Sequence, residues 1–197
     1  MLCNQHLSFQ QHVSNICRVC YFEIRRISSI RHYLSEDTTK MLLCAFVLSR
    51  LDYCNSLLAG SPSFLLDQLQ RVQNHAARLI SRSSKYDHIT PLLHSLHWLP
   101  IKKRIHYKVA SLCYNSFNST LPQYLQELLH IYTPMRTLRS STDTRVFTIP
   151  CTRTVSFGQR SFSFQGPTVW NKLPYSLRNS ATPSTFKASL KTHLFPL

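Results

Sequence analysis

The chain has 197 residues, of which 43% are hydrophobic and 11% aromatic, so it can bury a core and is not wholly disordered. Its 3 glycines nearly exclude a glycine-rich phosphate loop, and neither a GxGxxG nor a Walker A motif is present. Lysine and arginine together number 23 against 8 aspartates and glutamates. The resulting net charge of +15 indicates a polyanionic partner, usually nucleic acid and sometimes an anionic membrane.

No targeting or membrane segment is evident in the sequence. The longest apolar run, MLLCAFVL at 41–48, is far shorter than a membrane span and predicts a buried helix. The first residues lack the basic start and the long apolar stretch of a secretory signal. We therefore expect an intracellular protein, nuclear or cytoplasmic, whose seven cysteines stay reduced.

The first third of the chain predicts two helices. Apolar residues recur about every 3.5 positions over 10–34, which indicates a helix with one buried face. Ser35, followed by Glu36 and Asp37, has the pattern of a helix N-cap with an acidic first turn. The helix that begins there is expected to run to about Ala59 and to stop at Gly60.

The middle of the chain predicts one long helix and several shorter ones. Ser61-Pro62 opens a helix with a packing stripe formed by Leu65, Leu69, Val72, Ala76 and Leu79. Shorter helices are expected to open at Thr90-Pro91, Pro100 and Leu121-Pro122. Trp98, between two leucines, is predicted to lie in the core.

From Tyr132 onward the helical period is lost. The segments 145–150 and 152–157 predict two short strands, and prolines punctuate the stretch around Trp170. Thr182-Pro183 then predicts a last helix with Phe186, Leu190 and Leu194 on its apolar side. We expect a mainly α fold, with a helical bundle over 1–131 and a smaller, irregular α+β region over 132–197 that is basic and carries the two strands.

Catalytic and metal sites find little support in the sequence. Glu36 and Asp37 are the only adjacent carboxylates, and their place after Ser35 accounts for them, so no carboxylate pair is predicted to hold catalytic metal ions. A zinc site is the open alternative, with Cys3, His6, Cys17 and Cys20 as its ligands. The last two cysteines fall within the apolar helical pattern, which favours a role in the core. We expect no metal and no cofactor.

The stretch SLHWLPIKKRIHYKV, at 95–109, holds the densest group of cations. An amphipathic helix here places Ile101, Ile105 and Val109 inward, which predicts that Lys102, Lys103 and Arg104 point away from the core. A solvated helix face is the simpler interpretation of such a segment. The excess of unbalanced positive charge along the whole chain favours contact with phosphates instead.

Seven motifs occur in an order that resembles the C-terminal end of LINE-type, non-LTR retrotransposon reverse transcriptases, the jockey-like mobile elements. They are RLDYCNSLLAG (50–60), LQRVQNHAARLI (69–80), HITPLLHSLHWLPIKKRIHYKV (88–109), LPQYLQELL (121–129), RTLRSS (136–141), FGQRSFSFQGPTVWNKLP (157–174) and FKASLKTHLF (186–195). The resemblance covers nearly the whole chain from about Leu7. It implies a thumb-like bundle that follows the palm of an RNA-directed DNA polymerase, with a C-terminal region whose expected role is nucleic-acid binding.

The resemblance also implies what this chain lacks. The family's Asp-Asp polymerase turn and its endonuclease residues have no counterpart here, so no residue inherits a catalytic role and we expect the chain not to be an enzyme. The expected partners are RNA or an RNA–DNA duplex, bound through phosphates, and the palm of the parent polymerase. The predicted contacts are Arg71, Arg78, Lys102, Lys103, Arg104, Lys108, Arg136 and Arg139.

Two other functions remain open. The first alternative is a translated relic of a truncated element, which has no function. The second alternative is a helical protein-interaction module that uses the stripe at 65–79. A relic predicts that no folded protein is obtained, because a fragment of a larger enzyme exposes apolar surface. An interaction module predicts a stable oligomer.

Overall fold

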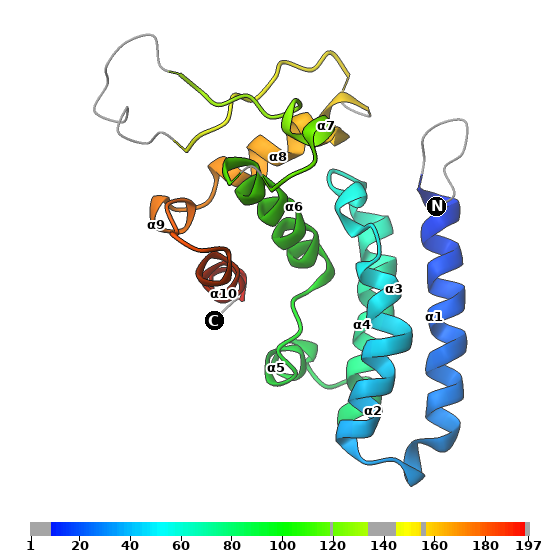
Figure 1. Ribbon diagram of the computed structural model, residues 1–197. Helices are drawn as coiled ribbons and strands as arrows, with labels where there is room; N and C mark the ends of the chain where they lie inside the picture. Colours follow the sequence, from blue (N-terminus) through cyan, green and yellow to red (C-terminus); the bar gives the residue numbers. More distant parts are fainter. Residues whose placement is uncertain (1–8, 119, 134–144, 155–156, 196–197) are drawn as a thin grey trace. The chain divides into compact units, whose positions relative to one another are not determined.

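The computed structural model describes residues 9–118, 120–133, 145–154 and 157–195, and it confirms the mainly α fold (Figure 1). The α-helices are α1 (Gln10–Ile30), α2 (Glu36–Leu43), α3 (Ser49–Asp52), α4 (Ser63–Ser81), α5 (Ile89–Ser95), α6 (Ile101–Phe117), α7 (Gln123–Gln126), α8 (Phe162–Asn171), α9 (Tyr175–Arg178) and α10 (Pro183–Leu194). Between them lie the 3₁₀ segments η1 (Arg31–Tyr33), η3 (Asn55–Leu58) and η4 (Gly158–Arg160), and the π-helical segment η2 (Cys44–Leu48).

The chain forms two compact units. Unit 1 takes the residues up to Asn55 together with 61–104, and unit 2 takes 56–60 together with the residues from Ile105 onward. The helix α6 therefore contributes its first residues to unit 1 and the remainder to unit 2. This division by packing is distinct from the boundary expected between 131 and 132, which stays a prediction. In the described part of the chain, no helix has both the length and the apolar character needed to cross a membrane.

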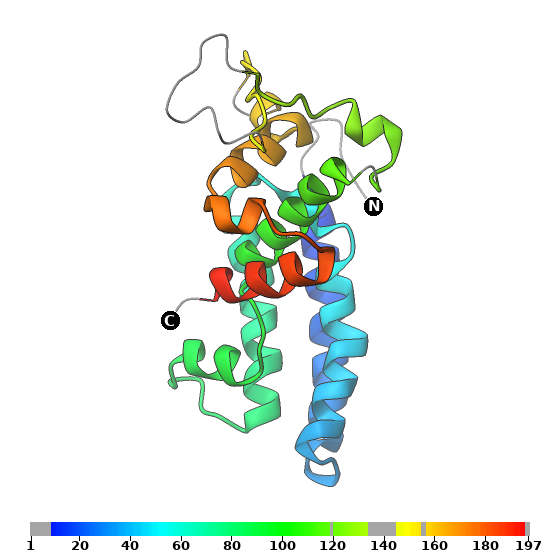
Figure 2. The same ribbon diagram turned by 60° about the vertical axis from the view of Figure 1, so that its left-hand side comes forward.

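In unit 1, α1 packs against α4 and against the run from α2 to α3, which lies beside it in both ribbon views (Figures 1 and 2). Most of the apolar face predicted for α1 is buried, with Val13 and Cys20 fully covered, but Ile30 at its end is 45% exposed. Trp98 is 5% exposed, which confirms its place in the core. The helical period in the sequence therefore predicts both the helix and the side it buries.

The run from α2 to α3 is a continuous helix with a π-helical turn in its middle. Ser35 caps it as predicted, because its hydroxyl accepts a hydrogen bond from the backbone N–H of Thr38 at 3.1 Å. At the π-helical segment, the Ser49 hydroxyl donates to the carbonyl of Ala45. The helix ends at Asp52, earlier than the predicted end near Ala59, and Cys54 then takes a positive φ of 52°.

The stripe predicted for α4 is buried from Leu65 to Ala76, whereas Leu79 is half-buried, and a buried arginine holds the C-terminal end of the helix. Leu65, Leu69 and Val72 are each at most 2% exposed. The guanidinium of Arg31 donates to the carbonyl of Leu79 at 2.9 Å and to that of Ile80 at 2.7 Å. Because the last carbonyls of a helix have no partner within it, this arginine stabilises the end of α4.

Unit 2 is built on an aromatic core. Tyr114, Phe147, Trp170 and Phe186 are each at most 2% exposed, and the rings of Tyr114 and Phe186 stack with centroids 4.3 Å apart. The last helix begins as predicted, with the hydroxyl of Thr182 accepting from the N–H of Thr185. The burial of these large aromatic side chains stabilises this unit.

The prolines around Trp170 suggested irregular structure, and this was wrong. Gly166, Pro167 and Trp170 all lie within α8 and are buried. Pro167 is the sixth residue of α8 and has no backbone N–H, so it removes one hydrogen bond from within the helix. Trp170, fully buried, thus packs from a helix in a stretch whose prolines indicated irregular structure.

The two predicted strands are not confirmed, and no sheet occurs among the described residues of 145–150 and 152–157. There is one isolated antiparallel bridge, between Ile131 and Phe147. The side chain of Asn171 pairs with both backbone groups of Phe147, at 3.1 and 2.8 Å. The indole of Trp170 donates to the carbonyl of Arg145 at 2.8 Å. Side chains of α8 thus satisfy backbone groups that a neighbouring strand would otherwise pair.

Candidate nucleic-acid interface

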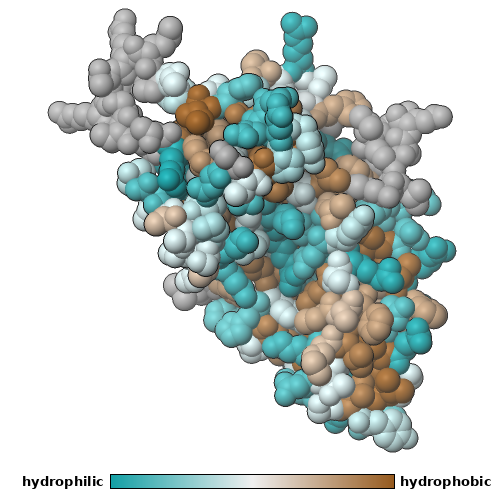
Figure 3. Space-filling view, in the orientation of Figure 1, coloured by the Kyte–Doolittle hydropathy of each residue, from teal (hydrophilic) through white to brown (hydrophobic). Residues whose placement is uncertain are grey.

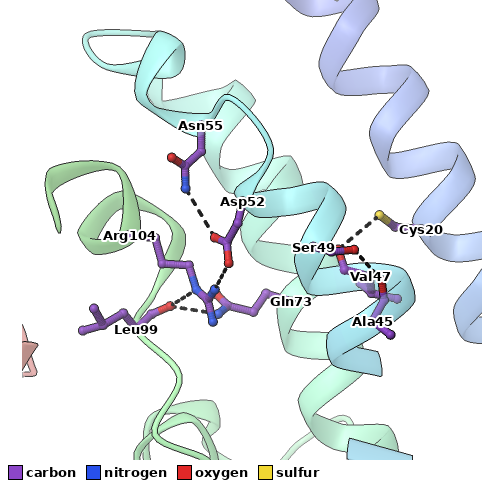
Figure 4. A network of polar contacts seen from close by, with 9 residues as sticks. All are labelled: Cys20, Ala45, Val47, Ser49, Asp52, Asn55, Gln73, Leu99 and Arg104. Atoms are coloured by element: carbon purple, nitrogen blue, oxygen red, sulfur yellow. Dashed lines mark hydrogen bonds and ion pairs between the residues drawn. The ribbon is translucent and has the colours of Figure 1, made fainter. Parts of the chain in front are cut away.

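Arg104 lies in a polar network at the start of α6, within unit 1 (Figure 4). Its Nη1 atom lies 2.6 Å from Oδ2 of Asp52, and its Nε donates to the carbonyl of Leu99 at 2.8 Å. The side chain of Gln73 donates to the same carbonyl at 2.8 Å. Only 15% of the Arg104 side chain is exposed. The prediction that it points away from the core was therefore wrong.

The geometry of a helix explains why Arg104 differs from its neighbours. Successive residues are rotated by about 100°, so three consecutive cations cannot share one outward face. Lys102 is exposed and Lys103 is half-buried, and neither forms an ion pair or a hydrogen bond with any residue that the structure describes. Lys108, also exposed, lies in the part of α6 that belongs to unit 2.

Further polar contacts fix where α6 begins. Oε1 of Gln70, on α4, accepts from the backbone N–H of Ile101 at 2.8 Å and so satisfies one of the free donors at the helix start. Asn55 donates to Oδ1 of Asp52 at 3.3 Å. The start of α6 is thus anchored to α4 through Gln70 and to the end of α3 through the ion pair of Arg104 with Asp52.

Arg71 lies on the exposed side of α4, close to α1. Burial raises the pKa of the Cys17 thiol and of the Tyr21 phenol, and in both cases the positive charge of Arg71 acts in the opposite direction. The ring of Tyr21 meets that of His75 edge to face, with centroids 5.4 Å apart. Arg71 therefore borders a surface formed by two packed helices, α1 and α4.

Arg78 has a structural role in the turn after α4. Its Nε donates to the carbonyl of Ser84 at 3.2 Å, and its Nη2 donates to the carbonyl of Asp87 at 3.1 Å. These bonds restrict the guanidinium but leave it accessible to solvent, since the side chain is half-buried. Arg136 and Arg139, the remaining predicted contacts, lie outside the described residues.

The outward face of α1 carries arginines that the prediction of contacts omitted. Arg18 and Arg25 are exposed and lie two turns apart, opposite the buried face of the helix. Arg25 makes no hydrogen bond or ion pair with any part of the chain that the structure describes. The signal that would have found both residues is their position in the helical period, out of phase with Val13, Cys20 and Ile24.

Of the cysteines proposed as zinc ligands, Cys17 is half-buried and Cys20 is buried. The Cys20 thiol lies 4.0 Å from the carbonyl of Val47 in the core of unit 1, as Figure 4 shows. Burial raises its pKa to about 12, which disfavours the thiolate that binds metal. Cys3 and His6 lie outside the described residues. Among the residues that are described, no group of three or more His, Cys, Asp or Glu is placed to hold a metal ion.

No protein-family model, curated protein or solved structure matches this chain.

Proposed function

We propose that this chain is a non-catalytic, C-terminal region of a LINE-type reverse transcriptase that binds RNA or an RNA–DNA duplex. The seven ordered motifs support the relationship, and the charge of the chain supports the activity. The proposal includes an intracellular location, nuclear or cytoplasmic, where such nucleic acids occur. It also includes the palm of the parent polymerase as a protein partner.

One observation carries the binding proposal. The net charge is +15, because 23 lysines and arginines stand against 8 aspartates and glutamates, so most of the cations have no carboxylate to pair with; Arg26–Glu23 and Arg104–Asp52 are two pairs that the described residues form. Arg71, Lys102 and Lys103 are left without a carboxylate partner in that part of the chain. Like charges that are not neutralised within a protein lower the stability of its compact state, and binding a polyanion removes this repulsion.

The mechanism is attraction to phosphate with the release of counterions. Lysine and arginine contacts to phosphates fix the position of a nucleic acid and carry no sequence information. Each contact releases condensed cations, so the affinity falls as salt rises.

Asp52 is already held by Arg104 and Asn55, which supports a structural rather than a catalytic role for this carboxylate.

Removing cations that have no carboxylate partner among the described residues tests this proposal. We expect replacement of Arg71, Lys102 and Lys103 with alanine to weaken RNA binding and to reduce the slope of log K against log salt by about 2 to 3 units. Fluorescence anisotropy with a labelled RNA at several salt concentrations measures both effects. Arg104 is left intact, because its loss would disturb the fold.

A charge-preserving variant provides the matched control. Exchanging Arg71 for lysine and both lysines for arginine keeps the three charges, so we expect the salt slope to stay within about half a unit of the original. An alanine variant that folds normally and binds with an unchanged slope would show that these residues do not contact phosphate.

A protein-interaction module is a second candidate, but not through the stripe first considered for it. Leu65, Leu69 and Val72 of that stripe are buried within unit 1. The observation that favours this candidate is a different apolar surface, visible where α1 and α2 lie together (Figure 3). Exposed residues of these helices include Ile30 at 45% and Met41 at 64%. A stable oligomer in solution would favour this candidate.

A further inference from the structure

The outward face of α1 combines guanidinium groups with an exposed aromatic ring. Arg18, Phe22 and Arg25 follow one another at spacings of four and three residues, which places them on one side of the helix. All three are exposed, and 52% of Phe22 is open to solvent. The opposite side of α1 packs on unit 1, and among the residues that the structure describes this face is directed toward solvent.

The charges on this face are only partly neutralised. Arg26 lies 3.4 Å from Glu23 and also stands over the Phe22 ring, 5.7 Å from its centroid. Arg18 donates to the side chain of Asn15 at 2.9 Å, a neutral partner that leaves its charge in place. The face therefore presents a net positive charge on either side of an aromatic ring.

An exposed phenyl ring among arginines distinguishes between forms of nucleic acid. In a duplex each base is stacked between its neighbours, so a protein meets phosphates, sugars and base edges, and a phenyl ring gains little. In a single strand the bases can turn outward, and stacking on an aromatic side chain adds to the phosphate contacts. Phe22 has the exposure that such stacking needs.

We propose that this face of α1 binds single-stranded RNA, with a base stacked on Phe22 and phosphates held by Arg18 and Arg25. The proposal rests on the proposed function and specifies its ligand. Arg71, on the neighbouring helix α4, lies close to Tyr21 and extends the positive surface beside α1. The strand is held by charge and by stacking, so recognition does not depend on a particular sequence.

An acidic protein segment is the competing occupant of this face. It would satisfy the same guanidinium groups, but it offers no planar base for the ring. The excess of charge over the whole chain also exceeds what one acidic segment would neutralise. These two observations favour nucleic acid, and an acidic peptide enters the test as a competitor.

Replacing the ring while keeping an apolar side chain tests the proposal. In the full chain, Phe22→Leu removes the aromatic face and retains helix propensity. We expect it to weaken binding of a 12-nucleotide oligouridine RNA by about five-fold or more, as loss of a stacked base predicts, and to leave binding of a 12-base-pair RNA duplex nearly unchanged. Phe22→Trp is expected to keep or strengthen binding of the single strand.

Phe64→Leu is the matched control. Phe64 is 50% exposed and lies on α4, with no arginine one turn away on either side. We expect its replacement to leave both affinities unchanged. An equal effect of the two leucine variants, or an equal loss of single-strand and duplex binding in Phe22→Leu, would overturn the proposal.

Two outcomes separate this inference from the proposed function. If the original chain binds neither RNA, the proposed function itself fails. If it binds RNA and Phe22→Leu binds the single strand equally well, only the role of this face is wrong. A hexaglutamate peptide that displaces the oligouridine at equal charge concentration, with no dependence on Phe22, would assign the face to an acidic protein partner and contradict the proposal.

Discussion

Arginine has two distinct uses in this protein. Arg31 and Arg178 are buried and donate to backbone carbonyls, whereas Arg25 and Arg71 are exposed. The planar guanidinium has five donors in a fixed arrangement, which suits it to hold several carbonyls at once. A count of cations therefore overstates the charge that is accessible to a ligand, and the accessible part is concentrated on the exposed faces of the helices.

Arg104 provides a test at the scale of one residue. We expect Arg104→Ala to lower the free energy of unfolding by about 2 kcal/mol, because it leaves the carbonyl of Leu99 and the carboxylate of Asp52 with fewer partners. Lys103→Ala, the adjacent control, should change it by less than about 0.5 kcal/mol. Urea unfolding followed by circular dichroism measures both values. Equal values would show that the network adds no stability.

At the scale of elements, capping was predictable because its signals are local. Ser35 precedes two acidic residues, and its hydroxyl does accept the predicted hydrogen bond. We expect Ser35→Ala to lower the free energy of unfolding by about 1 kcal/mol and Ser35→Asp to restore most of it. Thermal unfolding of the original protein and of the two variants measures these differences in stability. An aspartate variant no more stable than the alanine variant would contradict the assignment of the cap.

The elements that the sequence did not predict depend on distant residues. The helical period was enough for α1 and α4, since each buries one regular face. The course of 145–148 depends on hydrogen bonds from Trp170 and Asn171, which lie some two dozen positions away along the chain. The role of Arg104 likewise depends on Asp52, 52 positions away. The contacts of Trp170 and Asn171 with 145–148, and that of Arg104 with Asp52, leave no pattern in the local sequence.

At the scale of the whole molecule, charge was the most informative property, and it predicted a class of partner rather than a site. Some of the contact residues were predicted from clustering, which selected the consecutive cations of α6. Helix geometry directs the consecutive cations of α6 to different sides of the helix. On α1, in contrast, cations spread over two turns share the outward face. Clusters along a sequence are thus a weaker guide to a binding face than positions related by the helical period.

The salt dependence of RNA binding by the unmodified chain tests the central claim most directly. Its affinity for a 20-nucleotide single-stranded RNA is measured by anisotropy between about 50 and 200 mM salt. Contacts to at least four phosphates predict a slope of log K against log salt of about −3 or steeper. A folded protein that shows no binding at the lowest salt concentration, or binding whose strength does not change with salt, would contradict the account.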